Sequence, residues 1–205
     1  MRKNICSVLG AFLITINACH AGGIEELQRF VDKSISGKAS FIQRVFGSEG
    51  ELVQESTGVL SFKRPGQFKW HYQEPYEQIL VGDGVYLWVY DIDLMQVTRI
   101  PVEDAVGSNP AAILYGSKDI DLIFGLDALE SVNNMQRVRI TPYEESRLFK
   151  SIELGFSEAN LARMTLYDHF GQKTTIDFFE FEIPKLFEKD EFKFSPPENV
   201  DVVTP

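Results

Sequence analysis

The sequence predicts one mostly β domain, an antiparallel sheet accompanied by a few helices, and three observations support this fold class. Residues 67–72 alternate strictly between polar and aromatic, as a half-buried strand does. Residues 85–90 form an apolar run directly after Asp83-Gly84, a pair typical of tight turns. The chain has 205 residues, which suits one sizeable core, and we find no internal repeat, linker or low-complexity stretch.

The first 21 residues have the features of a secretory signal peptide. A basic start at residues 1–4 precedes the apolar run 5–16, and small residues follow up to Ala21. The run is shorter than the roughly 20 residues that a membrane-spanning helix needs. We therefore expect cleavage after Ala21 and a single mature domain over 22–205. Residues 16–19 also resemble a lipoprotein processing box, in which Cys19 would be acylated and become the first residue.

In the rest of the chain, the spacing of apolar residues distinguishes one helical segment from the segments expected to be strands. Apolar residues between Ile24 and Ile35 recur at helical spacing and predict an amphipathic helix. From about Ala39 the period changes to that of strands. We expect strands at 67–72, 85–90, 94–100, 137–141, 151–156, 161–168 and 174–182, with regular structure ending at 195–197.

Two short helices are expected to interrupt the sheet. Asn109 suits a helix N-cap, Pro110 the first helical position and Gly116 the end of that helix. Ser117 is expected to cap a second helix that ends at Gly125.

Composition and motifs argue against several functional classes. Thirty acidic and 20 basic residues give a net charge of −10, which disfavours nucleic acid and anionic membranes as partners. His71 and His169 stand apart from other metal donors, and Asp91 and Asp93 lack the rest of a calcium loop. There is no nucleophile elbow and no phosphate-binding loop in the sequence. We expect no catalytic residue, no metal and no cofactor. The hypothesis that the protein is an enzyme is the one that the sequence supports least.

The supply of aromatic residues is high, with 16 Phe, 7 Tyr and 2 Trp. They concentrate within residues 62–76 and 86–90. Two explanations remain open from the residues alone: a filled core, or a sheet curved around an apolar cavity.

Several segments together strongly resemble the LolA family, the periplasmic carriers of outer-membrane lipoproteins. They are KRPGQFKWHY (63–72), Glu74-Pro75, QILVGDG (78–84), LWVY (87–90), Asn109-Pro110 and FKFSPP (192–197). The resemblance covers nearly all of residues 24–197, and the Arg-Pro strand is its most specific part. Cys19 is a departure, because the family's carriers are soluble. An acylated Cys19 would suit LolB, the related outer-membrane receptor, and this is the alternative function.

The resemblance implies a fold, a cargo and partners. The fold would be an unclosed antiparallel β-barrel whose apolar concave face is covered by a lid of short α-helices. The cargo would be acylated outer-membrane lipoproteins, received from an inner-membrane ABC transporter of the LolCDE type and passed to a LolB-type receptor. We expect the carrier to act in the periplasm as a monomer.

The resemblance also assigns roles to residues. Arg64, the arginine of the Arg-Pro motif, is expected to hold the lid closed, and Phe68 to accept the ligand at the rim of the cavity. We expect Arg64 to bond the last carbonyls of the helix at 110–115, where the negative end of the helix dipole lies. The expected lipid-binding cavity is lined by Phe68, Trp70, Trp88, Ile113 and Leu114.

Overall fold

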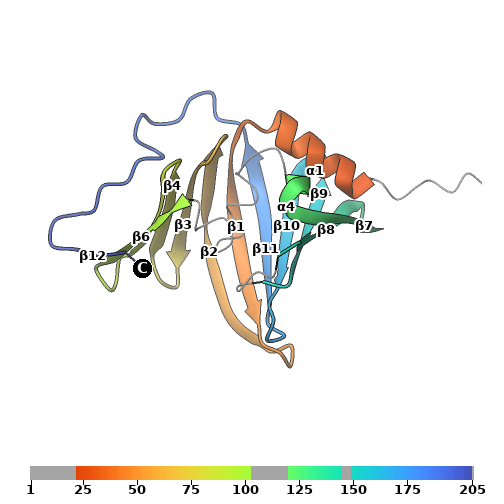
Figure 1. Cartoon of the computed structure of the whole chain (residues 1–205), viewed down its shortest axis with the longest axis horizontal. Helices are drawn as coiled ribbons and strands as arrows, with labels where there is room; N and C mark the ends of the chain where they lie inside the picture. The colour runs from red at the N-terminus through yellow and green to blue at the C-terminus, as the bar shows by residue number, and fades with distance from the viewer. Residues whose placement is uncertain (1–21, 103–119, 145–148, 205) are drawn as a thin grey trace, which may run out of the picture.

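A computed structural model of the chain describes residues 22–102, 120–144 and 149–204, and shows one curled sheet of twelve strands (Figure 1). The strand order is β12-β6-β5-β4-β3-β2-β1-β11-β10-β9-β8-β7, so β12 and β7 form its two edges and the sheet is unclosed. The strands are β1 (Ser36–Phe46), β2 (Leu52–Lys63), β3 (Gln67–Glu74), β4 (Gln78–Asp83), β5 (Tyr86–Asp91), β6 (Gln96–Pro101), β7 (Phe124–Val132), β8 (Met135–Pro142), β9 (Ser151–Ser157), β10 (Asn160–Tyr167), β11 (Lys173–Glu182) and β12 (Asp201–Val203).

Neighbouring strands pair antiparallel, except that β12 lies parallel to β6. The predicted mostly β class and the unclosed sheet are thus confirmed.

Helix α1 (Gly22–Lys33) packs on one face of this sheet, over β7, β8 and β9 (Figure 1). Its apolar residues Leu27, Phe30 and Val31 point into the core. Gly23 permits the close approach, because a Cβ there would lie 1.9 Å from the carbonyl oxygen of Arg137 in β8. We call the face that carries α1 the inner face of the sheet and the opposite one the outer face.

Four expectations about element boundaries were wrong. Ile35 lies beyond α1 and is 64% exposed, so it is not part of the helical face. The helix expected to end at Gly125 is the short α4 (Ile120–Ile123), and Phe124 already begins β7. Leu94 belongs to the turn before β6. Regular structure does not end at 195–197, since β12 follows. The signal peptide and the helix at 109–116 lie outside the described residues.

The segment between β11 and β12 returns across the sheet to its far edge (Figure 1). Phe194 in this segment packs on the outer-face side chains Trp88 and Tyr90, with ring centroids 5.5 and 5.8 Å apart. The last strand then adds to β6. The segment 183–203, here called the C-terminal strap, therefore covers part of the outer face.

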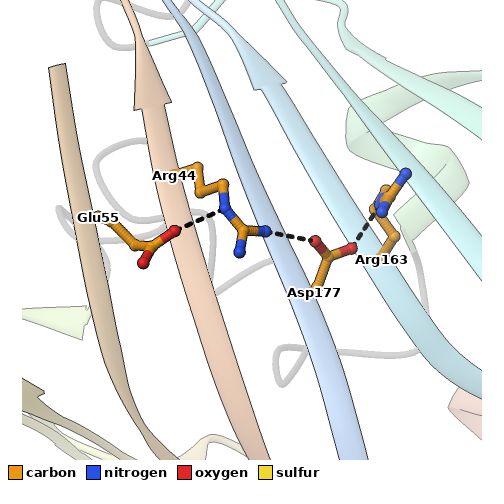
Figure 2. Close-up of polar contacts among 4 residues, drawn as sticks. All are labelled: Arg44, Glu55, Arg163 and Asp177. Carbon is orange, nitrogen blue, oxygen red and sulfur yellow. Dashed lines mark hydrogen bonds and ion pairs between the residues drawn. The ribbon is translucent and has the colours of Figure 1, made fainter. Parts of the chain in front are cut away.

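The outer face of the central strands is charged. Glu55 of β2, Arg44 of β1, Asp177 of β11 and Arg163 of β10 form a chain of ion pairs across four strands (Figure 2). The three N···O distances along it are 2.7, 3.3 and 2.5 Å. The contrast with the apolar inner face fixes which side of each strand is buried.

Candidate functional site

The inner face carries a continuous cluster of aromatic rings. Phe41 contacts Trp70 and Tyr72 at centroid distances of 5.0 and 5.2 Å, and Phe178 lies 6.0 Å from Trp70. Under α1, Phe30 meets Phe62 and Phe156 at 6.1 and 5.7 Å. Strand alternation explains the gathering, because residues two apart along each strand share a face.

Phe68 and Trp70 lie on this inner face, as the alternation of β3 predicted. They are 5% and 4% exposed. The ring of Phe68 covers Gly82 of β4, where an added Cβ would lie 2.4 Å from a ring carbon. Phe68 is therefore packed in the core and not at an open rim, and the expectation of a rim position was wrong for this arrangement.

Trp88 does not share the face of Phe68 and Trp70, so its expected place in the cavity was wrong. In the register of the sheet, Trp88 lies opposite Val81 and Arg99, whereas its neighbour Leu87 lies opposite Gly82 and belongs to the core. The Trp88 indole packs against Phe194, and its Nε1–H donates to Oδ2 of Asp83 at 2.8 Å. The alternation of β5 thus directs Trp88 to the outer face.

Ile113 and Leu114, the two expected cavity residues from the lid, lie outside the described residues. A hollow of about 270 Å³ does exist between α1 and the sheet. Its apolar lining comes from Leu27 and Val31 of α1, Ile120 of α4 and Leu126 of β7. This hollow is an opening between helix and sheet at the edge of the aromatic cluster.

Arg64 lies where α1 ends. Its Nε–H donates to the carbonyl oxygen of Ser34 at 3.0 Å, and its guanidinium carbon lies 5.4 Å from the Phe30 ring centre and 5.6 Å from that of Phe62. Its backbone N–H also donates to the carbonyl of Ile35, at 2.7 Å. A cation at a helix C-terminus interacts favourably with the helix dipole, and a guanidinium stacks well on aromatic faces.

Sequence reasoning missed the end of α1 as the partner of Arg64. The acceptor is a backbone carbonyl oxygen, which cannot be inferred from a pattern of side chains. Ser34 also lies 30 positions before Arg64 in the chain. Only the folding of β1 back along β2 brings the two residues together. The expected bond to the helix at 110–115 falls outside the described residues.

The described residues do not suggest a metal or membrane-spanning site. No group of three or more His, Cys, Asp or Glu side chains within them is placed to hold a metal ion. None of the helices in this part of the chain has the length and apolarity needed to cross a bilayer. The site therefore consists of an apolar surface on the inner face, with the Arg64 cation at the end of α1, the helix that covers part of this face.

Comparisons with known proteins assign the family. The family model of the outer membrane lipoprotein carrier protein LolA matches residues 32–195. An outer-membrane lipoprotein carrier protein of Nitrosospira multiformis is 40% identical over 194 residues, covering 94% of each chain. One of Nitrosomonas europaea is 35% identical and covers 94% of this chain and 97% of its own.

A solved structure, that of an uncharacterized conserved protein from Thermus thermophilus, shares the fold. Its TM-score is 0.56 at 15% identity, with 89% of this chain and 98% of that chain covered. The match of the family model and the identity to these relatives over nearly the full length show that this chain belongs to the LolA family of outer-membrane lipoprotein carrier proteins.

Proposed function

We propose that the chain is a periplasmic carrier that binds the acyl chains of outer-membrane lipoproteins. It would receive them from an inner-membrane ABC transporter of the LolCDE type and pass them to a LolB-type receptor at the outer membrane. The observation that carries this proposal is the apolar inner face of an unclosed sheet, with an amphipathic helix docked across one end. The family membership supports it.

The energetics of acyl chains explain why such a face is needed. Each methylene exposed to water costs about 0.8 kcal/mol, so several long chains together amount to tens of kcal/mol. A carrier moves them through water only if it covers them. Phe62, Phe68 and Trp70 are packed together here, so acyl chains can enter only when α1 shifts or these rings repack.

In this proposal Arg64 stabilises the closed position of α1. The bond to Ser34 and the stacking on Phe30 join the helix and its end to Arg64, directly after β2, and the stacking on Phe62 of β2 holds the guanidinium in place. Breaking these contacts on loading and restoring them on release offsets part of the acyl burial that the carrier loses. Handoff to the receptor is then easier than it would be from a rigid cavity.

The experiment is co-expression with a triacylated lipoprotein, followed by purification and mass spectrometry of the complex. We expect the acylated lipoprotein to co-purify, and a cargo whose lipidated cysteine is replaced by Ser to be absent. The Asp177→Asn variant, altered on the outer face, serves as a matched control and is expected to bind normally. Equal recovery of acylated and non-acylated cargo would overturn the proposal.

The alternative, a receptor anchored through an acylated Cys19, makes a different prediction for the mature N-terminus. Mass spectrometry would find Gly22 as a free N-terminus for a carrier and an acylated Cys19 for a receptor. The curated relatives described above are named carriers, which favours the first outcome.

A further inference from the structure

The inner face changes from apolar to polar along the strands, within two neighbouring rows of residues across the sheet. On four strands an apolar residue or glycine is followed, two positions further from α1, by a polar residue on the same face. The pairs are Phe41 and Gln43, Gly58 and Ser56, Leu80 and Gln78, and Val89 and Asp91. The register places the polar members in two neighbouring rows, since Gln43 lies opposite Ser56, whereas Gln78 lies opposite Asp91 and Tyr72, in the row of Gly58.

A pocket of about 480 Å³ lies at this polar end. Gln43, Gln54, Ser56, Tyr72, Gln78 and Asp91 line it, and we call it the polar-end pocket. Inside it the Nε2–H of Gln54 donates to Oγ of Ser56 at 3.0 Å. The lining is rich in side-chain amides, each of which offers two N–H donors and a carbonyl acceptor. An extended peptide presents the same two kinds of group along its backbone.

Tyr72 connects the polar-end pocket to the aromatic cluster. Its ring lies edge-on to Phe41 at 5.2 Å and stacks near Trp70 at 6.2 Å, while its hydroxyl donates to Oε1 of Gln43 at 3.0 Å. Burial raises the pKa of Tyr72 well above its ordinary value, against the opposing effect of the Gln43 bond, so the hydroxyl stays a neutral donor.

The indole of Trp70, beside Tyr72, contains a second buried polar group. Its Nε1–H is buried, and no hydrogen-bond acceptor within residues 22–102, 120–144 or 149–204 meets it. A buried donor left without an acceptor is unfavourable, so this position suits a ligand that brings one. Ester and amide carbonyls, which join acyl chains to an acylated cysteine, are acceptors of this kind.

We propose that the polar-end pocket binds the polypeptide that follows the acylated cysteine of a lipoprotein, while the acyl chains lie on the apolar part of the inner face. The inference rests on the proposed carrier function and assigns this pocket the recognition of the peptide part of the cargo. The order of surfaces along the strands, from apolar through buried hydroxyl and indole donors to amides, matches the order of groups in an acylated lipopeptide.

The charge of the pocket excludes a competing class of lipid. Asp91 and Asp93 both line it, and no Lys, Arg or His is among its lining residues in the described part of the chain. A phospholipid would place its phosphate beside these carboxylates, and like charges at close range repel. A neutral peptide backbone meets no such repulsion. The pocket therefore favours lipoprotein over the phospholipids that surround it in the inner membrane.

The test compares three ligands with the full purified chain, by displacement of a fluorescent fatty acid. They are a triacylated cysteine followed by four neutral residues, the same triacylated cysteine ending as a methyl amide, and phosphatidylglycerol. We expect the wild type to bind the peptide-bearing ligand about tenfold more tightly than the methyl amide, a ratio that one or two hydrogen bonds supply. Gln43→Leu should bring that ratio close to one and leave the methyl-amide affinity unchanged, and Tyr72→Phe should lower the ratio as well.

The matched control is Tyr90→Phe, the same substitution on the outer face, which should keep the wild-type ratio. Urea unfolding of each variant verifies that the fold is retained. If the wild type binds both acylated ligands equally, the pocket does not recognise the peptide and the inference is overturned. The carrier function would still stand in that case. If neither acylated ligand binds, the carrier function itself fails and the inference with it.

A charge-reversal experiment separately tests the discrimination between lipoprotein and phospholipid. Asp93→Lys should raise the affinity for phosphatidylglycerol several-fold, because the lysine pairs with the phosphate. Asp127→Lys makes the same change on β7, away from the polar-end pocket, and should have no effect. An unchanged phosphatidylglycerol affinity in Asp93→Lys would contradict the proposed exclusion of phospholipids.

Discussion

The Nε–H of Arg64 donates a hydrogen bond to the carbonyl oxygen of Ser34, 3.0 Å away, at the point where α1 ends. This contact joins the end of β2 to the only long helix in the described part of the chain. A charge-assisted hydrogen bond contributes about 1.5–3 kcal/mol, which corresponds to a bias of roughly 10- to 150-fold toward the docked position of α1. From the size of this bias we expect lipoprotein transfer to be sensitive to substitution of Arg64.

Arg64→Leu is expected to load with lipoprotein but to release it poorly, because release no longer restores the contact with α1. Arg64→Lys keeps a charge but loses the planar stacking on Phe30 and Phe62, so its defect should be milder. The measurement is transfer of lipoprotein from the purified complex to a LolB-type receptor. Arg44→Leu, on the outer face, is the control, and normal transfer by Arg64→Leu would contradict this role.

Phe68→Glu is expected to lower the free energy of unfolding by about 3 kcal/mol or more, because it removes a buried ring and places a carboxylate in the core. At the rim position expected from the sequence, this variant would fold normally, whereas the observed burial of Phe68 predicts a loss of stability. Urea unfolding measures the loss. Phe68→Leu, which keeps an apolar side chain, should lose less, and equal stability of Phe68→Glu and the wild type would contradict the packed position.

Glu153→Gln tests the ion pairs on the outer face of β9. The Glu153 carboxylate accepts from Arg137 at 2.6 Å and from Arg139 at 2.8 Å, and its side chain is 9% exposed. We expect a loss of about 1–2 kcal/mol in unfolding free energy, at the lower end for charged bonds because the Arg139 side chain is 44% exposed. Glu55→Gln, whose side chain is 48% exposed, should lose less than half as much in the same urea titration.

Asp83 predicts a pH dependence of stability. Burial alone would raise the pKa of Asp83, but bonds from the backbone N–H of Tyr86, the indole of Trp88 and the backbone N–H of Val85 hold this pKa below its ordinary 3.8. A lowered folded-state pKa stabilises the fold above the unfolded value, and this stabilisation is lost as the pH falls through the folded value.

Asp83→Asn should therefore be less stable than the wild type at pH 7, and the difference should shrink below about pH 4. Urea unfolding at a series of pH values measures it. Trp88→Phe removes one of the three donors and should reduce the pH-dependent part without abolishing it. A difference that stays constant with pH would contradict the role of the Asp83 charge.

Phe194→Ala should loosen the C-terminal strap, because Phe194 supplies the ring that packs on both Trp88 and Tyr90. We expect cleavage within residues 183–203 to become several-fold faster in limited proteolysis, with the rest of the sheet intact. Phe170→Ala, at a ring that is 86% exposed in the β10–β11 turn, is the control. Unchanged cleavage would mean that β12 alone retains the strap.

The sequence predicted the elements whose patterns are local. The alternation of Gln67–Tyr72 correctly placed Phe68 and Trp70 on one face, since side chains alternate along any strand. Trp88 was placed on the wrong side because the run 85–90 is apolar on both faces. The outer face of this strand is covered by Phe194, which comes from a distant part of the chain. That contact cannot be inferred from the local sequence pattern.

The end of α4 and the polar-end pocket show the same limit in other ways. Gly125 is typical of a helix end, yet pairing of Phe124 with Pro142 in β8 draws this segment into the sheet. Gln43, Ser56 and Gln78 look like ordinary strand residues one by one. Only the register of four pairings brings them to the same end of the inner face, and register depends on contacts between distant segments.

The separation of β7 from β12 at opposite ends of the strand order affects how the molecule can expand. In a closed barrel, widening the interior would strain or break main-chain hydrogen bonds around the ring. Here the two edges are not joined in the ladder, so the sheet can uncurl while every strand keeps its neighbours. A bulky guest can then be admitted by uncurling of the sheet, with changes in side-chain packing and helix position but no loss of main-chain pairing, a soft deformation that reverses when the guest leaves.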